Sequence, residues 1–110
     1  MLLRFKANEK NIVNLSEIIK ELHFEKMIVV CNNSITANLY ADKLSLLIEW
    51  QVKRDIDRTF LYKDNKKIIF YFNEDSNRIR GHRVDKICLF GKFKKDFVEL
   101  VACGLCAVQK

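Results

Sequence analysis

The run Met27-Ile28-Val29-Val30-Cys31 decides the fold, because it is apolar without interruption and rich in β-branched side chains. A strand with one face in water would alternate apolar and polar residues, so this run predicts a strand covered on both faces within a parallel sheet. The polar residues Asn32-Asn33-Ser34 follow and can supply a turn and a helix N-cap. From Ile35 to Trp50 apolar residues recur at helical spacing, which predicts an amphipathic helix.

Upstream of this run, the sequence predicts a short strand and a helix. Leu2 to Phe5 is a candidate first strand. Asn14 is the expected N-cap of the helix, with Glu17 completing a capping box. The helix should end near His23, and its apolar residues keep helical spacing: Leu15, Ile18, Ile19 and Leu22.

Downstream, a β-hairpin is expected where Phe60–Tyr62 and Ile68–Phe72 flank the polar residues 63–67. Ile87–Phe90 predicts a further short buried strand that Gly91 stops, and apolar residues at helical spacing predict a C-terminal helix. The chain as a whole therefore reads as a single α/β domain over residues 1–110. We expect a mostly parallel sheet, helices on its faces and one β-hairpin.

The composition fits a globular protein of one domain, with 49% hydrophobic and 31% charged residues in 110. The formal net charge is +6, and most of the excess lies between Arg78 and Asp96, where seven basic residues face two acidic ones. No apolar run reaches the ~20 residues of a membrane helix, and no signal peptide is recognisable. We therefore expect a cytoplasmic protein without a membrane partner.

The four cysteines are Cys31, Cys88, Cys103 and Cys106, and all lie in apolar segments. Cys103 and Cys106 have C-x-x-C spacing, but they fall near the end of a predicted helix rather than at its start. A zinc site would need two further ligands, and the other two cysteines lie within predicted strands. Reduced, buried thiols and no metal are the expectation.

The segment Lys66–Lys92 carries the most information about function. A hairpin is followed by Arg78-Ile79-Arg80-Gly81 and then by an apolar strand that closes on Gly91-Lys92. This arrangement resembles the Walker B region of phage terminase large subunits and related helicase-like P-loop ATPases. Phe97-Val98-Glu99-Leu100 is similar to the helix that follows in that family, and Met27–Ser34 to the strand and polar turn after its phosphate-loop helix. The resemblance implies half of a P-loop NTPase-like core.

The departures from that family imply that nucleotide hydrolysis is lost. The stretch matching the phosphate-binding loop is residues 5–11, which contains Lys10 but no glycine, so its backbone could not cradle phosphates. The two acidic Walker B positions fall on Gly91 and Lys92. A degenerate nucleotide site at Lys10, Gly91 and Lys92 is therefore expected, with no catalytic residue and no cofactor.

The basic residues around the last strand form the candidate nucleic-acid site. Basic side chains neutralise phosphates, and an aromatic ring such as that of Phe93 can stack on a base. The alternative interpretation is a solvated basic rim or a protein interface. The candidate contacts are Arg78, Arg80, Arg83, Lys92, Phe93, Lys94 and Lys95.

These observations leave two functions open, and the first is preferred. It is a non-catalytic, P-loop-derived protein of a phage or mobile element that binds DNA or a DNA-processing machine. The second is a small phage protein-interaction module that binds a host protein without contacting nucleic acid. A third class, an NTPase completed by a partner chain, is disfavoured by Gly91 and Lys92.

Overall fold

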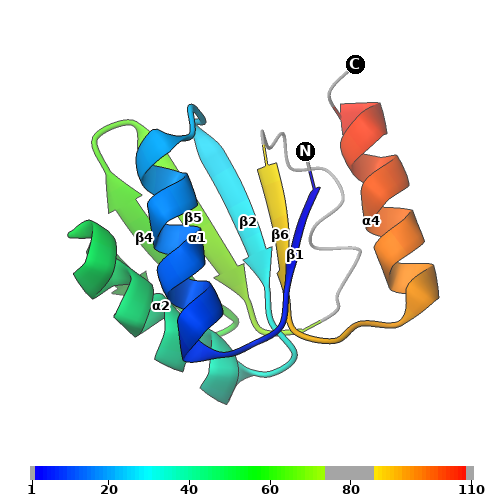
Figure 1. The fold of residues 1–110 in the computed structure, drawn as a ribbon, viewed down its shortest axis with the longest axis horizontal. Helices are drawn as coiled ribbons and strands as arrows, with labels where there is room; N and C mark the ends of the chain where they lie inside the picture. The colour runs from blue at the N-terminus through cyan, green and yellow to red at the C-terminus, as the bar shows by residue number, and fades with distance from the viewer. Residues whose placement is uncertain (1, 74–85, 109–110) are drawn as a thin grey trace.

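The computed structural model describes residues 2–73 and 86–108, with side chains described as far as Val101. They form a single α/β domain with a six-stranded sheet in the order β1-β6-β2-β5-β4-β3 (Figure 1). The helices are α1 (Glu9–Glu21), α2 (Ser34–Ile48) and α4 (Lys95–Val108). The strands are β1 (Leu2–Phe5), β2 (Lys26–Val30), β3 (Gln51–Arg54), β4 (Arg58–Lys63), β5 (Lys66–Tyr71) and β6 (Lys86–Phe90). Within the described ranges no helix is long and apolar enough to cross a membrane.

The prediction for β2 is confirmed. It lies between β5 and β6 and runs parallel to both, so its neighbours satisfy both of its edges. Its side chains alternate between two apolar cores. Met27 and Val29 join the core beneath α1 and α2, whereas Ile28 and Val30 join the core that includes Phe97 and Val101 of α4.

The expectation of a mostly parallel sheet with one hairpin is corrected. The sheet is mixed, because β1, β6, β2 and β5 are parallel whereas β5, β4 and β3 form an antiparallel meander. The predicted hairpin is β4–β5, and β3 is an additional strand. All its residues are exposed, so the hydrophobic pattern gave no sign of it. Pairing with β4 and the bonds from Arg54 to Asn38 and Asp42 of α2 hold β3 in place.

The expected N-cap of α1 at Asn14 is wrong, because α1 begins earlier in the chain. Asn8 is the N-cap, and its Oδ1 accepts the backbone N–H of Asn11 over 2.8 Å. Ile12 then fills the apolar face of the first turns and is buried. The predicted start of α2 is confirmed, since Asn33 caps it by accepting the N–H of Thr36 over 2.8 Å.

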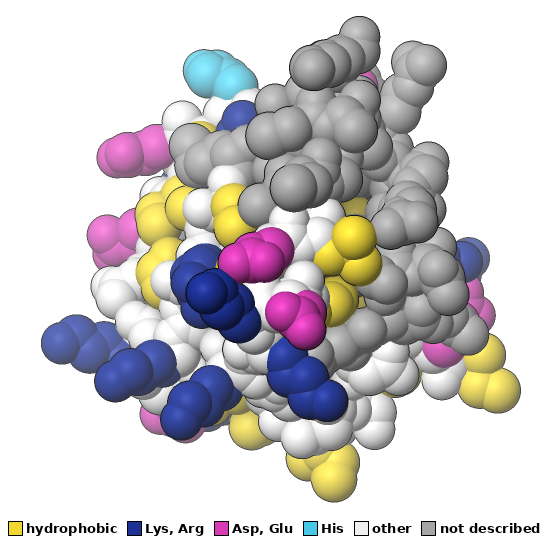
Figure 2. All heavy atoms as spheres, turned by 90° about the vertical axis from the view of Figure 1, so that its right-hand side faces the viewer, with side chains coloured by type: hydrophobic (Ala, Val, Ile, Leu, Met, Phe, Trp, Pro, Cys, Tyr) yellow, Lys and Arg dark blue, Asp and Glu magenta, His cyan; other side chains and the backbone are white. Residues whose placement is uncertain are grey.

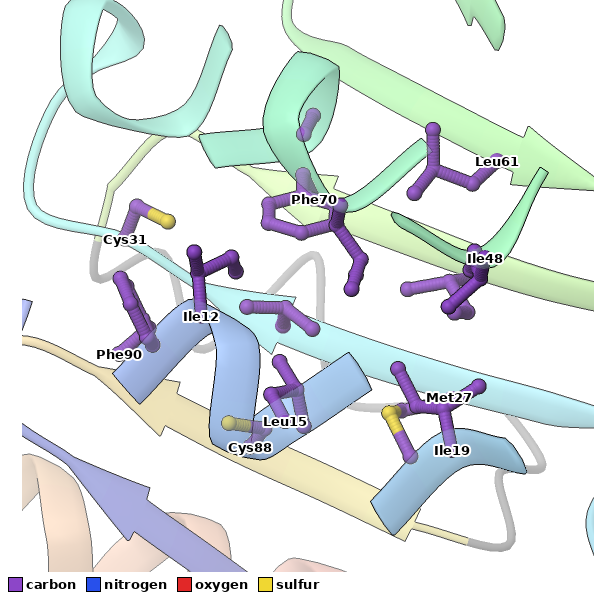
Figure 3. Packing of buried hydrophobic residues seen from close by; sticks show 14 of the residues in the cluster. Ile12, Leu15, Ile19, Met27, Cys31, Ile48, Leu61, Phe70, Cys88 and Phe90 are labelled. Atoms are coloured by element: carbon purple, nitrogen blue, oxygen red, sulfur yellow. The ribbon is translucent and has the colours of Figure 1, made fainter. Parts of the chain in front are cut away.

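The larger core lies between the sheet and the pair of helices α1 and α2. In Figure 3, Ile12, Leu15 and Ile19 of α1 point toward the sheet. Met27, Phe70 and Cys88 point back from three of its strands. The end of β6 is fixed in this core, because the Phe90 ring meets Tyr40 of α2 edge-on, with 4.9 Å between centroids.

Two of the four thiols are fully described, and both are free and buried in this core. Cys31 and Cys88 follow the predicted pattern, while the side chains of Cys103 and Cys106 lie outside the described residues. Among the described residues, no group of His, Cys, Asp or Glu could hold a metal ion. Burial raises the pKa of the Cys31 thiol to about 12. Burial and the neighbouring Cys31 raise the pKa of Cys88 as well.

These raised pKa values predict a loss of stability in alkali. Below the ordinary thiol pKa of 9.0 both thiols are neutral in the folded and unfolded chain, and the stabilisation is complete. Above it the unfolded chain ionises first, so the free energy of unfolding should fall by about 1.4 kcal/mol per pH unit for each thiol until the folded pKa is reached. Urea unfolding between about pH 8 and pH 10.5 measures this slope. A Cys31→Ala/Cys88→Ala variant should have a flatter profile, and equal slopes in the two proteins would refute the assignment.

Candidate functional site

The candidate site lies at the carboxyl edge of the sheet, where β1 and β6 end side by side. The two strands pair in parallel register up to Phe5 and Phe90, and the N–H of Gly91 donates to the carbonyl of Phe5 over 2.9 Å. The chain then leaves β1 for α1 on one face and leaves β6 for α4 on the other (Figure 1). Adjacent parallel strands whose connections part in this way leave a crevice between them, where ligands of open α/β sheets bind.

An open groove of about 850 Å³ occupies this crevice. Among the described residues that line it, three side chains are basic and none is acidic. The ends of β1 and β6 supply most of the lining, which consists of Arg4, Phe5, Lys6, Ala7, Asn32, Gly91, Lys92 and Phe93. Basic side chains gather in the lower part of Figure 2, the end at which these strands finish. We call this feature the carboxyl-edge groove.

Asn32 holds the floor of the carboxyl-edge groove together. Its Nδ2 donates to the carbonyl of Lys92 over 2.8 Å, and its Oδ1 accepts the N–H of the same residue over 3.3 Å. The clamp joins the residues after β2 to those after β6. It also fixes the backbone of Lys92 while the charged end of that side chain stays exposed.

Gly91 is required by this clamp. Its φ of +138° lies in a region that side-chain-bearing residues rarely adopt, and a Cβ there would stand 2.1 Å from Oδ1 of Asn32. No side chain can therefore occupy position 91 while Asn32 holds Lys92. The position that the resemblance assigns to a metal-binding acid is closed to any carboxylate by the neighbouring amide.

The connection from β1 to α1 differs from the expected loop over residues 5–11. Lys6, Ala7 and Asn8 alone join the two elements, a shorter link than the G-x-x-x-x-G stretch of a phosphate-binding loop. Asn11 donates from its side chain to the carbonyl of Lys6 over 2.9 Å, which pins the link. Lys10 lies exposed in the first turn of α1 and does not line the groove.

Glu9, the acid nearest to the start of α1, is engaged elsewhere. It forms an exposed ion pair with Lys43 of α2. The hydrogen bond and the positive charge of Lys43 hold the pKa of Glu9 below its ordinary value. Glu9 therefore stays ionised and paired, and its charge is partly neutralised by Lys43.

The groove gathers some of the predicted residues and adds others. Gly91, Lys92 and Phe93 line it, and the Phe93 ring also packs against Phe97 with 5.5 Å between centroids. Lys94 and Lys95 are exposed just beyond it, and Lys95 lies 3.9 Å from Glu99. The predicted contacts Arg78, Arg80 and Arg83 lie outside the described residues.

Arg4, Lys6 and Asn32 are groove residues that the sequence analysis did not select. Arg4 and Lys6 stand two apart across the end of β1, a weak signal that any surface strand can show. Only the pairing of β1 with β6 brings them beside Lys92.

Comparison of the chain with protein-family models, with curated proteins and with solved structures found no match.

Proposed function

We propose that the domain binds the phosphate backbone of nucleic acid in the carboxyl-edge groove and hydrolyses no nucleotide. The observation that carries the proposal is the charge of the groove: of its described lining residues, Arg4, Lys6 and Lys92 are basic and none is acidic. Lys94 and Lys95 continue the positive charge toward α4. A row of basic side chains along a groove tracks a polyanion, and each neutralised phosphate adds salt-dependent affinity.

The resemblance to phage terminases and helicase-like ATPases supports the second half of the proposal. In such enzymes, catalysis needs a loop that cradles the phosphates and an acid that helps to hold the metal ion. Here the link between β1 and α1 is short and pinned by Asn11, and Asn32 closes position 91 to a carboxylate. We therefore propose a P-loop-derived protein of a phage or mobile element that retains a basic groove and does not hydrolyse nucleotide.

Replacing the basic side chains of the groove should reduce the salt dependence of binding. For Arg4→Gln/Lys6→Gln/Lys92→Gln we expect the slope of log K against log salt to fall in magnitude by about 3 on duplex DNA, near 0.9 for each lost contact. All three side chains are exposed, so the fold should survive. Fluorescence anisotropy across a salt series measures the slope.

The matched control is Lys20→Gln, which removes one exposed positive charge from the last turn of α1. It should leave the slope nearly unchanged. The same titration on Arg78→Ala/Arg80→Ala tests the predicted arginine contacts, for which a decrease of about 2 is expected. A triple groove variant that keeps the slope of the parent protein would contradict the proposal.

A protein-interaction module is the second candidate, and one feature of α2 favours it. Ile35 and Leu46 are each 80% exposed, and with Leu39 they form an apolar stripe on the side of α2 that faces away from the core. Exposed apolar stripes of this kind mark interaction surfaces. Weak DNA binding with no dependence on the groove charges would favour this candidate over the first.

A further inference from the structure

A second basic surface lies on the sheet itself, on the face opposite α1 and α2. Phe60 belongs to the core on that face, and because side chains alternate along a strand, Tyr62 shares its side. Lys53 is the cross-strand partner of Phe60, and Lys67 is that of Tyr62. Lys26 is the next neighbour of Lys67 in the same row, on β2.

This face changes from buried to exposed across the sheet. Ile28 and Ile69 in its middle are buried, whereas Lys53 and Lys67 are exposed and Tyr62 is 39% exposed. The described strands place no acidic residue on this face, and Asp57, just before β4, lies 3.7 Å from Nε of Arg58. We call this region the sheet platform; it is formed by the exposed residues Lys53, Tyr62 and Lys67 and the half-buried residues Arg58 and Phe60.

Cations and rings are interleaved on the sheet platform. The guanidinium of Arg58 and the ammonium of Lys67 each lie 5.2 Å from the centroid of the Phe60 ring. Lys67 and Lys26 are direct cross-strand partners, so their positive charges lie on neighbouring strands of one face. A polyanion laid over the face would be attracted to both, which is the charge complementarity that identifies the occupant.

We propose that the sheet platform binds single-stranded nucleic acid, with a base stacked on Tyr62 and phosphates paired with Lys53 and Lys67. The ring of Tyr62 is 39% exposed, whereas Arg58 and Lys67 already lie over the ring of Phe60. A base that stacks on Tyr62 must leave the stack of its own strand. A single strand permits this, whereas a paired duplex holds its bases in the stack.

The sheet platform is distinct from the carboxyl-edge groove. Lys26 and Lys67 lie at the beginnings of β2 and β5, whereas the groove lies at the ends of β1 and β6. Substitutions can therefore remove the charges of either surface without changing the other. A negative result for the groove would not contradict the proposal for the sheet platform.

The test uses the full chain and an oligo-dT probe, compared with an abasic oligonucleotide of the same length and charge. Tyr62→Ala should weaken binding of oligo-dT by about tenfold, and Tyr62→Phe should stay within about twofold of the parent, because stacking depends on the ring. Tyr62→Leu, which keeps an apolar side chain on the strand, should bind as weakly as Tyr62→Ala. Circular dichroism and the melting temperature establish that each variant is folded.

The abasic probe separates stacking from charge. It should bind the parent protein more weakly than oligo-dT and should not respond to Tyr62→Ala, whereas Lys53→Gln/Lys67→Gln should weaken the binding of both probes. Lys20→Gln is the charge control and Lys92→Gln is the groove control, and the tenfold effect of Tyr62→Ala should persist in the Lys92→Gln background. Equal oligo-dT affinity in Tyr62→Ala and the parent, or an equal loss on the abasic probe, would overturn the proposal.

Discussion

Gly91→Asp is expected to lower the free energy of unfolding by about 3 kcal/mol or more. The φ of +138° at this position is accessible almost only to glycine, and holding another residue there costs about 1–3 kcal/mol. The new Cβ would also stand 2.1 Å from Oδ1 of Asn32. Asn32 must then move, and its two bonds to the backbone of Lys92 are lost at about 1 kcal/mol each.

Urea unfolding of Gly91→Asp, Gly91→Ala and Asn32→Gly, together with the double variant Gly91→Ala/Asn32→Gly, separates these effects. Gly91→Ala should account for most of the loss of stability. The double variant should lose less free energy of unfolding than its two single changes added together, because Asn32→Gly removes the atom with which the new Cβ clashes. Gly91→Asp should gain no ATPase activity under Mg²⁺. A stable Gly91→Asp protein that hydrolyses ATP would refute both the steric account and the non-catalytic proposal.

Phe90→Ala is expected to cost about 3–5 kcal/mol, the usual range for removing a fully buried phenylalanine. The ring is completely buried and meets Tyr40 edge-on, so its loss leaves a cavity between β6 and α2. Gly91 and Lys92 follow directly, so the carboxyl-edge groove should lose its shape together with stability.

Chemical denaturation measures the first effect and DNA binding the second. Phe90→Leu refills much of the space and should cost clearly less, and it should keep the salt slope of the parent. If the free energy of unfolding of Phe90→Ala lies within about 1 kcal/mol of the parent value, the packing described at the end of β6 is contradicted.

The parts of the fold that the sequence predicted are those with a strong local pattern. Met27–Val30 is apolar throughout and is the central parallel strand, and Asn33 caps α2 as its position suggested. β3 could not be found in this way, because Gln51–Arg54 buries nothing and is fixed by its partner strand and by α2. The N-cap at Asn14 was wrong because the predicted apolar face began at Leu15, whereas Ile12, one turn earlier, is also buried on it.

The candidate site was predicted only where it is contiguous in the chain. Lys92 and Phe93 were predicted from the basic cluster after one strand and Gly91 from the resemblance, and all three line the groove. Arg4 and Asn32 belong to it through a parallel pairing between distant segments, which no local pattern encodes. The steric clash that excludes a side chain at position 91 also involves Asn32, which only the fold brings next to Gly91.

The place of β6 in the sheet has a consequence for synthesis of the chain. Among the described strands it is the last to be synthesised, yet it lies between β1 and β2. Until it arrives, both of those strands present an unpaired edge, and Cys88 and Phe90 are missing from the core beneath α1 and α2. A nascent chain without β6 therefore has an open seam through its sheet, the kind of edge that recruits chaperones or other chains. Closing the seam pairs β1 with a strand that follows it by more than 80 residues, for example Leu2 with Ile87, so we expect this contact of high sequence separation to form late in folding.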